Sequence, residues 1–216
     1  MAGTCMWSPK IGNDISSGTR LLVRRGMSAI NLSANYDLHL SEVFACLVCG
    51  IVFAGVTALL SSPLAAILGG YLMFTMALVV IIDYRHFTIP NVLSLPAIPL
   101  GLLAAVSAFP EPALLDHILA AAIAGLFLYG VRAIYWKMRG VEGLGLGDVK
   151  LGIAAGAWVG LEALPLTCLL ATGAALIAVM IRGRSGQTSM TTPVPLGSFI
   201  APAIAIVWLV RLLTAI

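Results

Sequence analysis

The chain has 216 residues, of which 60% are hydrophobic and only 10% are charged, and its mean hydropathy is +1.04. Soluble domains are usually about 45–50% apolar and about 25% charged. This composition therefore excludes a soluble globular enzyme, a disordered tail and a nucleic-acid-binding module with a basic face. The four cysteines are too few for a disulfide scaffold. We predict an integral membrane protein with an all-α fold, a polytopic bundle of six to seven transmembrane helices.

The first 40 residues differ from the rest of the chain. They are rich in Ser, Asn and Gly, carry the basic residues Lys10, Arg20, Arg24 and Arg25, and lack an apolar run long enough for the core of a signal peptide. We predict that residues 1–40 form a cytosolic, mostly irregular N-terminal arm, with a short amphipathic helix near residues 20–30. Met27 is an alternative start residue. Residues 41–216 are predicted to form one membrane-embedded domain.

Six apolar runs follow the arm. A helix needs about 20 apolar residues to cross the hydrocarbon core of a membrane, and such runs occupy residues 43–60, 64–82, 92–109, 113–136, 151–181 and 196–216. As one helix the fifth run would be about 46 Å long, which exceeds a hydrocarbon core of about 30 Å. Gly160, Glu162 and Pro165 predict a turn within it. A short helix would end near Trp158 and a full-length one would begin near Leu164, which gives seven helices.

The basic residues predict the orientation, because short cytosolic loops are enriched in Lys and Arg. With seven helices, 11 of the 12 basic residues fall on the side of the N-terminus, and only Arg211 falls on the other. We therefore predict a cytosolic N-terminus and a C-terminus outside. Four aromatic residues near the ends of the runs are expected at the membrane interface: Tyr135, Trp136, Trp158 and Trp208.

Two acidic residues at the membrane boundary are candidate catalytic residues. Asp83 follows the second apolar run and Asp148 precedes the fifth. Two complete helices lie between them, and an even number of crossings returns the chain to the same side of the membrane. Two carboxylates that meet at a partly desolvated site tend to share one proton. One can then act as general base on a water while the other polarises a peptide carbonyl.

A structural role is the alternative for each acid alone. An Asp at a helix end often caps the helix or pairs with a nearby Arg, and Arg85 is close to Asp83 in the chain. Glycines at positions 143, 145 and 147 precede Asp148. Without side chains they allow a tight turn, and they are expected to leave room for a substrate strand beside the carboxylate.

The residues around the two acids carry a family resemblance. Asp83 is followed by Ile89-Pro90-Asn91, and Asp148 lies in the run Glu142-Gly-Leu-Gly-Leu-Gly-Asp-Val-Lys150. This combination resembles the type IV prepilin peptidases, the GxGD class of membrane aspartic proteases. The segment Val-Pro-Leu-Gly-Ser-Phe at residues 194–199 looks like the final segment of that family. A Phe is more usual there in place of Leu196, and a Pro in place of Ser198.

The resemblance covers about residues 64–201 and implies an activity. Such enzymes are aspartic endopeptidases that cut the short basic leader from type IV pilin-like precursors after a Gly, at the cytosolic face of the bacterial inner membrane. It implies that residues 41–216 are the peptidase domain and that Asp83 and Asp148 are the catalytic pair. A group of neighbours would position the substrate or the loop: Gly145, Gly147, Lys150, Glu142, Pro90 and Asn91. The expected partners are a prepilin-like precursor and the lipid bilayer, with no nucleic acid, metal or cofactor.

The pair Cys46 and Cys49 has the spacing of a metal or redox motif, but it lies inside the first apolar run. A zinc site needs four ligands, and the other two cysteines stand alone in the sequence. We interpret the pair as packing residues. Larger members of the resembled family that are also N-methyltransferases carry paired Cys-x-x-Cys elements in a cytosolic loop. We therefore expect no N-methyltransferase activity, and the short form leans toward the peptidases of Flp or tight-adherence pili.

Two other functions compete with this interpretation. Presenilin-like or signal-peptide-peptidase-like intramembrane proteases also use a GxGD element, but their first Asp usually follows a Tyr and a late Pro-Ala-Leu element is present. Here Tyr84 follows Asp83, and the late element is Pro-Leu-Gly. A small non-enzymatic transporter or assembly subunit whose acids carry protons is the second alternative. Such a protein should hold acids deep in its helices, whereas the carboxylates of this chain lie near the ends of the apolar runs.

Overall fold

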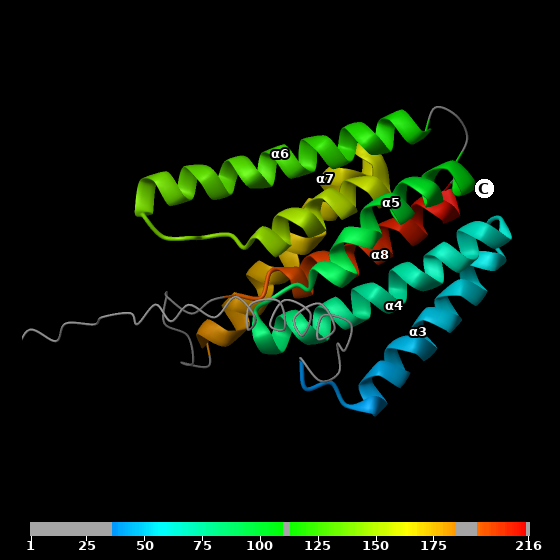
Figure 1. The fold of residues 1–216 in the computed structure, drawn as a ribbon, viewed down its shortest axis with the longest axis horizontal. Helices are drawn as coiled ribbons and strands as arrows, with labels where there is room; N and C mark the ends of the chain where they lie inside the picture. Colours follow the sequence, from blue (N-terminus) through cyan, green and yellow to red (C-terminus); the bar gives the residue numbers. More distant parts are fainter. Residues whose placement is uncertain (1–35, 110–112, 185–193, 215–216) are drawn as a thin grey trace, which may run out of the picture. The chain divides into compact units, whose positions relative to one another are not determined.

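A computed structural model describes residues 36–109, 113–184 and 194–214 of the chain (Figure 1). These residues form helices and short loops, and the described part contains no β-strand. The helices are α3 (Leu40–Ala58), α4 (Pro63–His86), α5 (Asn91–Ala108), α6 (Ala113–Arg139), α7 (Leu146–Arg184) and α8 (Gly197–Thr214). All six are long and apolar enough to cross a membrane. The prediction of an all-α, multi-pass membrane protein is confirmed.

The chain divides into two units between residues 38 and 39, and the six helices make up the second unit. The helix expected near residues 20–30 and the alternative start at Met27 lie outside the described residues. The boundary of the N-terminal arm at residue 40 stays a prediction.

The two ends of α4 are fixed by local chemistry. At its start the hydroxyl of Ser62 accepts a hydrogen bond from the backbone N–H of Ala65, and Pro63 occupies the first helical position. At its end Phe87 adopts a left-handed conformation (φ 50°), and its N–H donates to the carbonyl of Asp83. Few non-glycine residues adopt this conformation. The sharp stop places Asp83 in the last turn of α4.

Two tryptophans are buried inside the bundle. Trp158 and Trp208 are fully buried, and their rings meet edge to face with centroids 5.5 Å apart. The indole N–H of Trp158 donates to the carbonyl of Ala97 at 2.7 Å. Both residues are thus covered by protein, and their level relative to the membrane interface stays a prediction. Tyr135 and Trp136 are exposed on α6.

Helix α7 consists of two antiparallel segments joined at Gly160. This residue has φ 73° and ψ 174°, a conformation that interrupts the helix and that favours glycine. Val179 lines the same cavity as Asp148, although a straight helix would separate the two by about 46 Å. Figure 1 shows the chain turning back at the yellow corner of α7. The predicted turn is confirmed, and the second segment begins directly at Leu161 rather than near Leu164.

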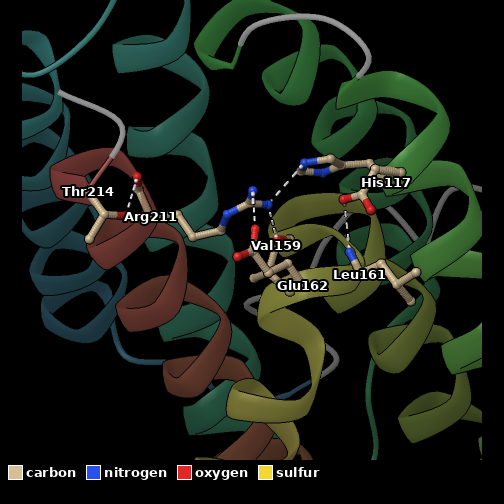
Figure 2. Close-up of polar contacts among 7 residues, drawn as sticks. His117, Val159, Leu161, Glu162, Arg211 and Thr214 are labelled. Carbon is tan, nitrogen blue, oxygen red and sulfur yellow. Dashed lines mark hydrogen bonds and ion pairs between the residues drawn. The ribbon is translucent and has the colours of Figure 1, made fainter.

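Polar side chains hold this turn together, as Figure 2 shows. Arg211 of α8 donates to the carbonyl of Val159, the last residue before the turn, and its guanidinium lies 3.9 Å from the carboxylate of Glu162. A carboxylate oxygen of Asp116, on α6, accepts from the backbone N–H of Leu161 at 3.0 Å. This bond caps the start of the second segment, where backbone N–H groups have no helical partner.

His117 extends the cluster into the bundle. Its side chain is buried, with Nδ1 2.9 Å from the carbonyl oxygen of Ala157 and Nε2 3.4 Å from Arg211. Its ring stacks on that of Phe109, at the end of α5. Side chains from α5, α6 and α8 thus converge on the turn of α7. Because Arg211 lies in the last turn of α8, the cluster marks the end of the bundle opposite to the first turn of that helix.

Candidate active site

Asp83 and Asp148 line one cavity of about 210 Å³. Its other walls come from the loop after α4 and from the residues around the start of α7, with Phe87, Thr88, Ile89, Gly145, Leu146 and Gly147. Asp83 is buried, with 4% of its surface exposed, and Asp148 is partly exposed. The common cavity agrees with the even number of helices between the two residues.

The carboxylate of Asp83 is held by the start of α8. The backbone N–H of Ser198 donates to Oδ2 of Asp83 at 2.7 Å, and the Ser198 hydroxyl lies 3.2 Å from the same oxygen and 3.3 Å from the carbonyl of Val80. N–H groups in the first turn of a helix lack a helical acceptor, and that end of the helix favours negative charge. No local sequence pattern predicts a role for Ser198. The only signal was its place in the late segment that resembles the family.

Asp148 lies in the first turn of α7, and the glycines before it are closely packed. A β-carbon on Gly145 would lie 3.2 Å from Oδ2 of Asp148, and one on Gly147 would lie 2.9 Å from Cβ of Ile89. The space beside Gly147 is therefore filled by a side chain of this protein, where the sequence analysis expected room for a substrate strand.

Arg132 of α6 holds the loop that leads to Asp148. One of its guanidinium nitrogens donates to the carbonyl of Leu144, and another donates to Oε1 of Glu142 at 2.6 Å. The predicted positioning residue Glu142 is thus paired with Arg132 and lies outside the lining of the carboxylate cavity. Sequence reasoning missed Arg132, because its separation of ten residues from Glu142 spans a helix end and matches no helical spacing.

Two other predicted positioning residues bond to each other. Nζ of Lys150 donates to Oδ1 of Asn91 at 2.7 Å, which ties the start of α5 to the first turns of α7. Pro90 is buried and occupies the position directly before the first residue of α5. None of the three belongs to the residues that line the cavity with the two aspartates. Their contacts position the two loops around the carboxylates.

The cysteine pair is not part of a metal-binding cluster among the described residues. Cys46 and Cys49 both belong to α3, where Cys46 is buried and Cys49 is exposed. Within the described residues, no group of three or more His, Cys, Asp or Glu side chains could hold a metal ion.

Comparison with known proteins places these residues in a family. The sequence model of the type IV leader peptidase family matches residues 70–181, just over half of the chain, and this range includes both aspartates. No solved structure matches the chain.

Three relatives carry the name prepilin leader peptidase/N-methyltransferase. The protein of Pseudomonas aeruginosa is 40% identical over 147 residues, covering 65% of this chain and 49% of the relative. That of Stutzerimonas stutzeri is 37% identical over 147 residues (65% and 50%), and that of Burkholderia pseudomallei strain 1026b is 35% identical over 153 residues (70% and 49%). The chain spans about half the length of these curated relatives. By its match to the family model, the chain belongs to the type IV leader peptidase family.

Proposed function

We propose that the chain is a leader peptidase for type IV pilin-like precursors, an aspartic endopeptidase that cuts after the Gly at the end of the leader. The observation that carries this proposal is the common cavity of Asp83 and Asp148. Membership of the family supports a peptidase, and the names of the relatives support prepilin precursors as substrates. The peptidase activity alone is proposed, without the N-methyltransferase activity that those names include.

In the proposed reaction the two carboxylates carry one proton between them. The ionised carboxylate takes a proton from water as the water oxygen attacks the scissile carbonyl carbon, while the protonated one donates a hydrogen bond to the carbonyl oxygen. The C–N bond breaks as the leaving nitrogen takes up a proton, which yields a free acid and a free amine. We assign the base role to Asp83, because two donors of Ser198 and the start of α8 favour its ionised form. Asp148 then holds the proton.

We further propose that the carboxylates face the cytosol, at the inner membrane of a bacterium. The end of the bundle that carries them also carries Arg85, Arg132, Lys150 and Arg182, whereas Arg211 lies in the cluster at the opposite end. Cytosolic ends of membrane helices are enriched in Lys and Arg. This distribution supports a cut made on the side where a basic leader stays.

The test is cleavage of a prepilin by the purified full chain. Asp83→Asn and Asp148→Asn should each lower kcat by at least about a thousandfold, because removing one member of a catalytic unit removes most of the chemical step. Asp116→Asn is the matched control: it lies in the cluster at the other end, and its amide oxygen can still accept the bond from Leu161. This variant should retain cleavage.

Three outcomes would contradict the proposal. Appreciable cleavage by Asp83→Asn or Asp148→Asn would remove the catalytic pair. Cleavage within the apolar segment of the substrate, in place of the end of the leader, would favour an intramembrane protease of the presenilin type. A folded wild-type protein that cuts no substrate would favour a non-enzymatic role.

A further inference from the structure

Ile89 lies between the two regions that carry the carboxylates. It belongs to the loop after α4, six residues beyond Asp83, and lines the cavity together with both aspartates. Only 7% of its surface is exposed. Its side chain is thus committed to contacts inside the protein.

One side of Ile89 packs on the backbone at Gly147, directly before Asp148. A β-carbon on Gly147 would lie 2.9 Å from Cβ, 3.3 Å from Cγ1 and 3.4 Å from Cδ1 of Ile89. Real β-carbons essentially never approach within 3.0 Å. The first turn of α7 therefore rests on the branched end of this side chain, with no room for a side chain in between.

Ile89 also packs on Gly197, at the start of α8. A β-carbon there would lie 2.7 Å from Cδ1 of Ile89 and 3.0 Å from Oδ2 of Asp83. Gly197 directly precedes Ser198, the residue that donates to Asp83. The same side chain thus bounds the segment that holds Asp83 and the segment that carries Asp148.

We propose that Ile89 is a positioning residue whose side chain sets the separation between Asp83 and Asp148. This inference rests on the proposed peptidase function. A β-branched side chain has restricted χ1 rotation and keeps a fixed width. Proton sharing between two carboxylates depends on their distance, and a misplacement of about 1 Å at a catalytic centre can cost about a hundredfold in rate.

The experiment compares Ile89→Ala, Gly147→Ala and the double variant in prepilin cleavage. Ile89→Ala should lower kcat by about tenfold or more, with KM within about twofold of the wild type, because substrate binding is retained. Gly147→Ala should lower kcat too, since its new β-carbon meets Ile89. In the double variant two of the three contacts with the new β-carbon, those with Cγ1 and Cδ1, are removed, and only the contact with Cβ remains to be relieved. Its kcat should therefore exceed the product of the two single effects by at least about fivefold.

Ile153→Ala is the matched control. A β-carbon on Gly125 would lie 2.7 Å from Cγ1 of Ile153, so this pair repeats the Ile–Gly contact between α6 and α7, away from the cavity lining. Its kcat should stay at the wild-type value. Ile89→Val, which removes only the methyl nearest Gly197, should lower kcat by about twofold to threefold. This variant tests the positioning role of Ile89 if Ile89→Ala does not accumulate as folded protein.

The inference is overturned by a wild-type kcat in Ile89→Ala, or in Ile89→Val where only that variant folds. A rise in KM at unchanged kcat also overturns it, because it would make Ile89 a substrate contact. Strictly multiplicative losses in the double variant, or an equal loss in Ile153→Ala, would reduce the effect to general packing. Failure of the peptidase proposal is distinct: the wild type would not cleave, or Asp148→Asn would remain active.

Discussion

The hydroxyl of Ser198 lies within hydrogen-bond distance of two acceptors. It lies 3.2 Å from Oδ2 of Asp83 and 3.3 Å from the carbonyl of Val80, and it carries one proton. The backbone N–H of Ser198 donates to Oδ2 at 2.7 Å. The hydroxyl can therefore donate to an ionised Asp83 and turn to Val80 when the carboxylate is protonated. In the proposed reaction, such a hydroxyl would help Asp83 to change its protonation state.

Replacing Ser198 tests this contribution. Ser198→Ala keeps the N–H and removes the hydroxyl, so kcat for prepilin should fall by about twofold to tenfold, the value of one hydrogen bond of about 0.5–1.5 kcal/mol. Ser198→Thr keeps the hydroxyl and should retain most of the activity. Ser107→Ala, which removes a hydroxyl bonded to the carbonyl of Ala104 on α5, is the control and should match the wild type. An unchanged kcat in Ser198→Ala would contradict the role.

At the scale of single elements, the turn inside α7 determines where Asp148 lies. Gly160 adopts a conformation that other residues avoid, and a β-carbon there would lie 2.4 Å from Oδ2 of Asp116 and 2.6 Å from a guanidinium nitrogen of Arg211. The turn thus depends both on the backbone freedom of glycine and on the polar cluster around it. The first segment, 146–159, runs from the end of the bundle that carries the carboxylates to the turn at the opposite end.

Gly160→Ala should therefore destabilise the protein by at least about 1–3 kcal/mol, the cost of a strained backbone conformation. Thermal unfolding in detergent measures the effect as a lowered Tm. Gly173→Ala is the control: Gly173 lies in the second segment of the same helix, with nothing within 4 Å of an added β-carbon. It should keep or raise the Tm, because Ala favours a helix over Gly. Equal Tm values for the two variants would show that the turn tolerates a side chain.

The sequence predicts the helices well because a lipid-facing side chain must be apolar wherever its helix lies. The hydropathy and the length of the fifth apolar run predicted the break in α7 near Gly160. The even number of helices between Asp83 and Asp148 predicted that both lie on the same side of the membrane. Hydropathy does not distinguish a surface that faces lipid from one that faces protein, which is why the burial of Trp158 and Trp208 was missed. Contacts such as Ser198 with Asp83 join residues 115 positions apart, and no local pattern encodes them.

On the scale of the whole molecule, the two ends of the bundle should lie on opposite sides of the membrane. Val141, in the loop before α7, is 58% exposed at the carboxylate end. The side chain of Glu162 is 89% exposed at the other end. Gly143, in the same loop as Val141, could not carry a cysteine for labelling, because a β-carbon there would lie 2.3 Å from the ring of Tyr135.

Cysteine labelling measures this sidedness, in a chain whose four native cysteines are replaced. A membrane-impermeant thiol reagent should label Val141→Cys only in inverted vesicles and Glu162→Cys only in intact cells, as expected if the basic end is cytosolic. The reversed pattern would place the carboxylates outside. Labelling of both variants from one side would contradict the placement of the two ends on opposite sides of the membrane.

The contact between Asp83 and Ser198 also bears on how the protein is made. Asp83 lies on the second of the described helices and its donors lie on the last, α8. A chain is synthesised from its N-terminus, so Asp83 and Asp148 both emerge before the residues that hold Asp83. Arg211, which bonds to the turn of α7, also belongs to α8. A nascent chain that has not yet produced α8 therefore lacks the donors that hold Asp83. Under the proposed function, it should begin to cleave precursors only after that helix has joined the bundle.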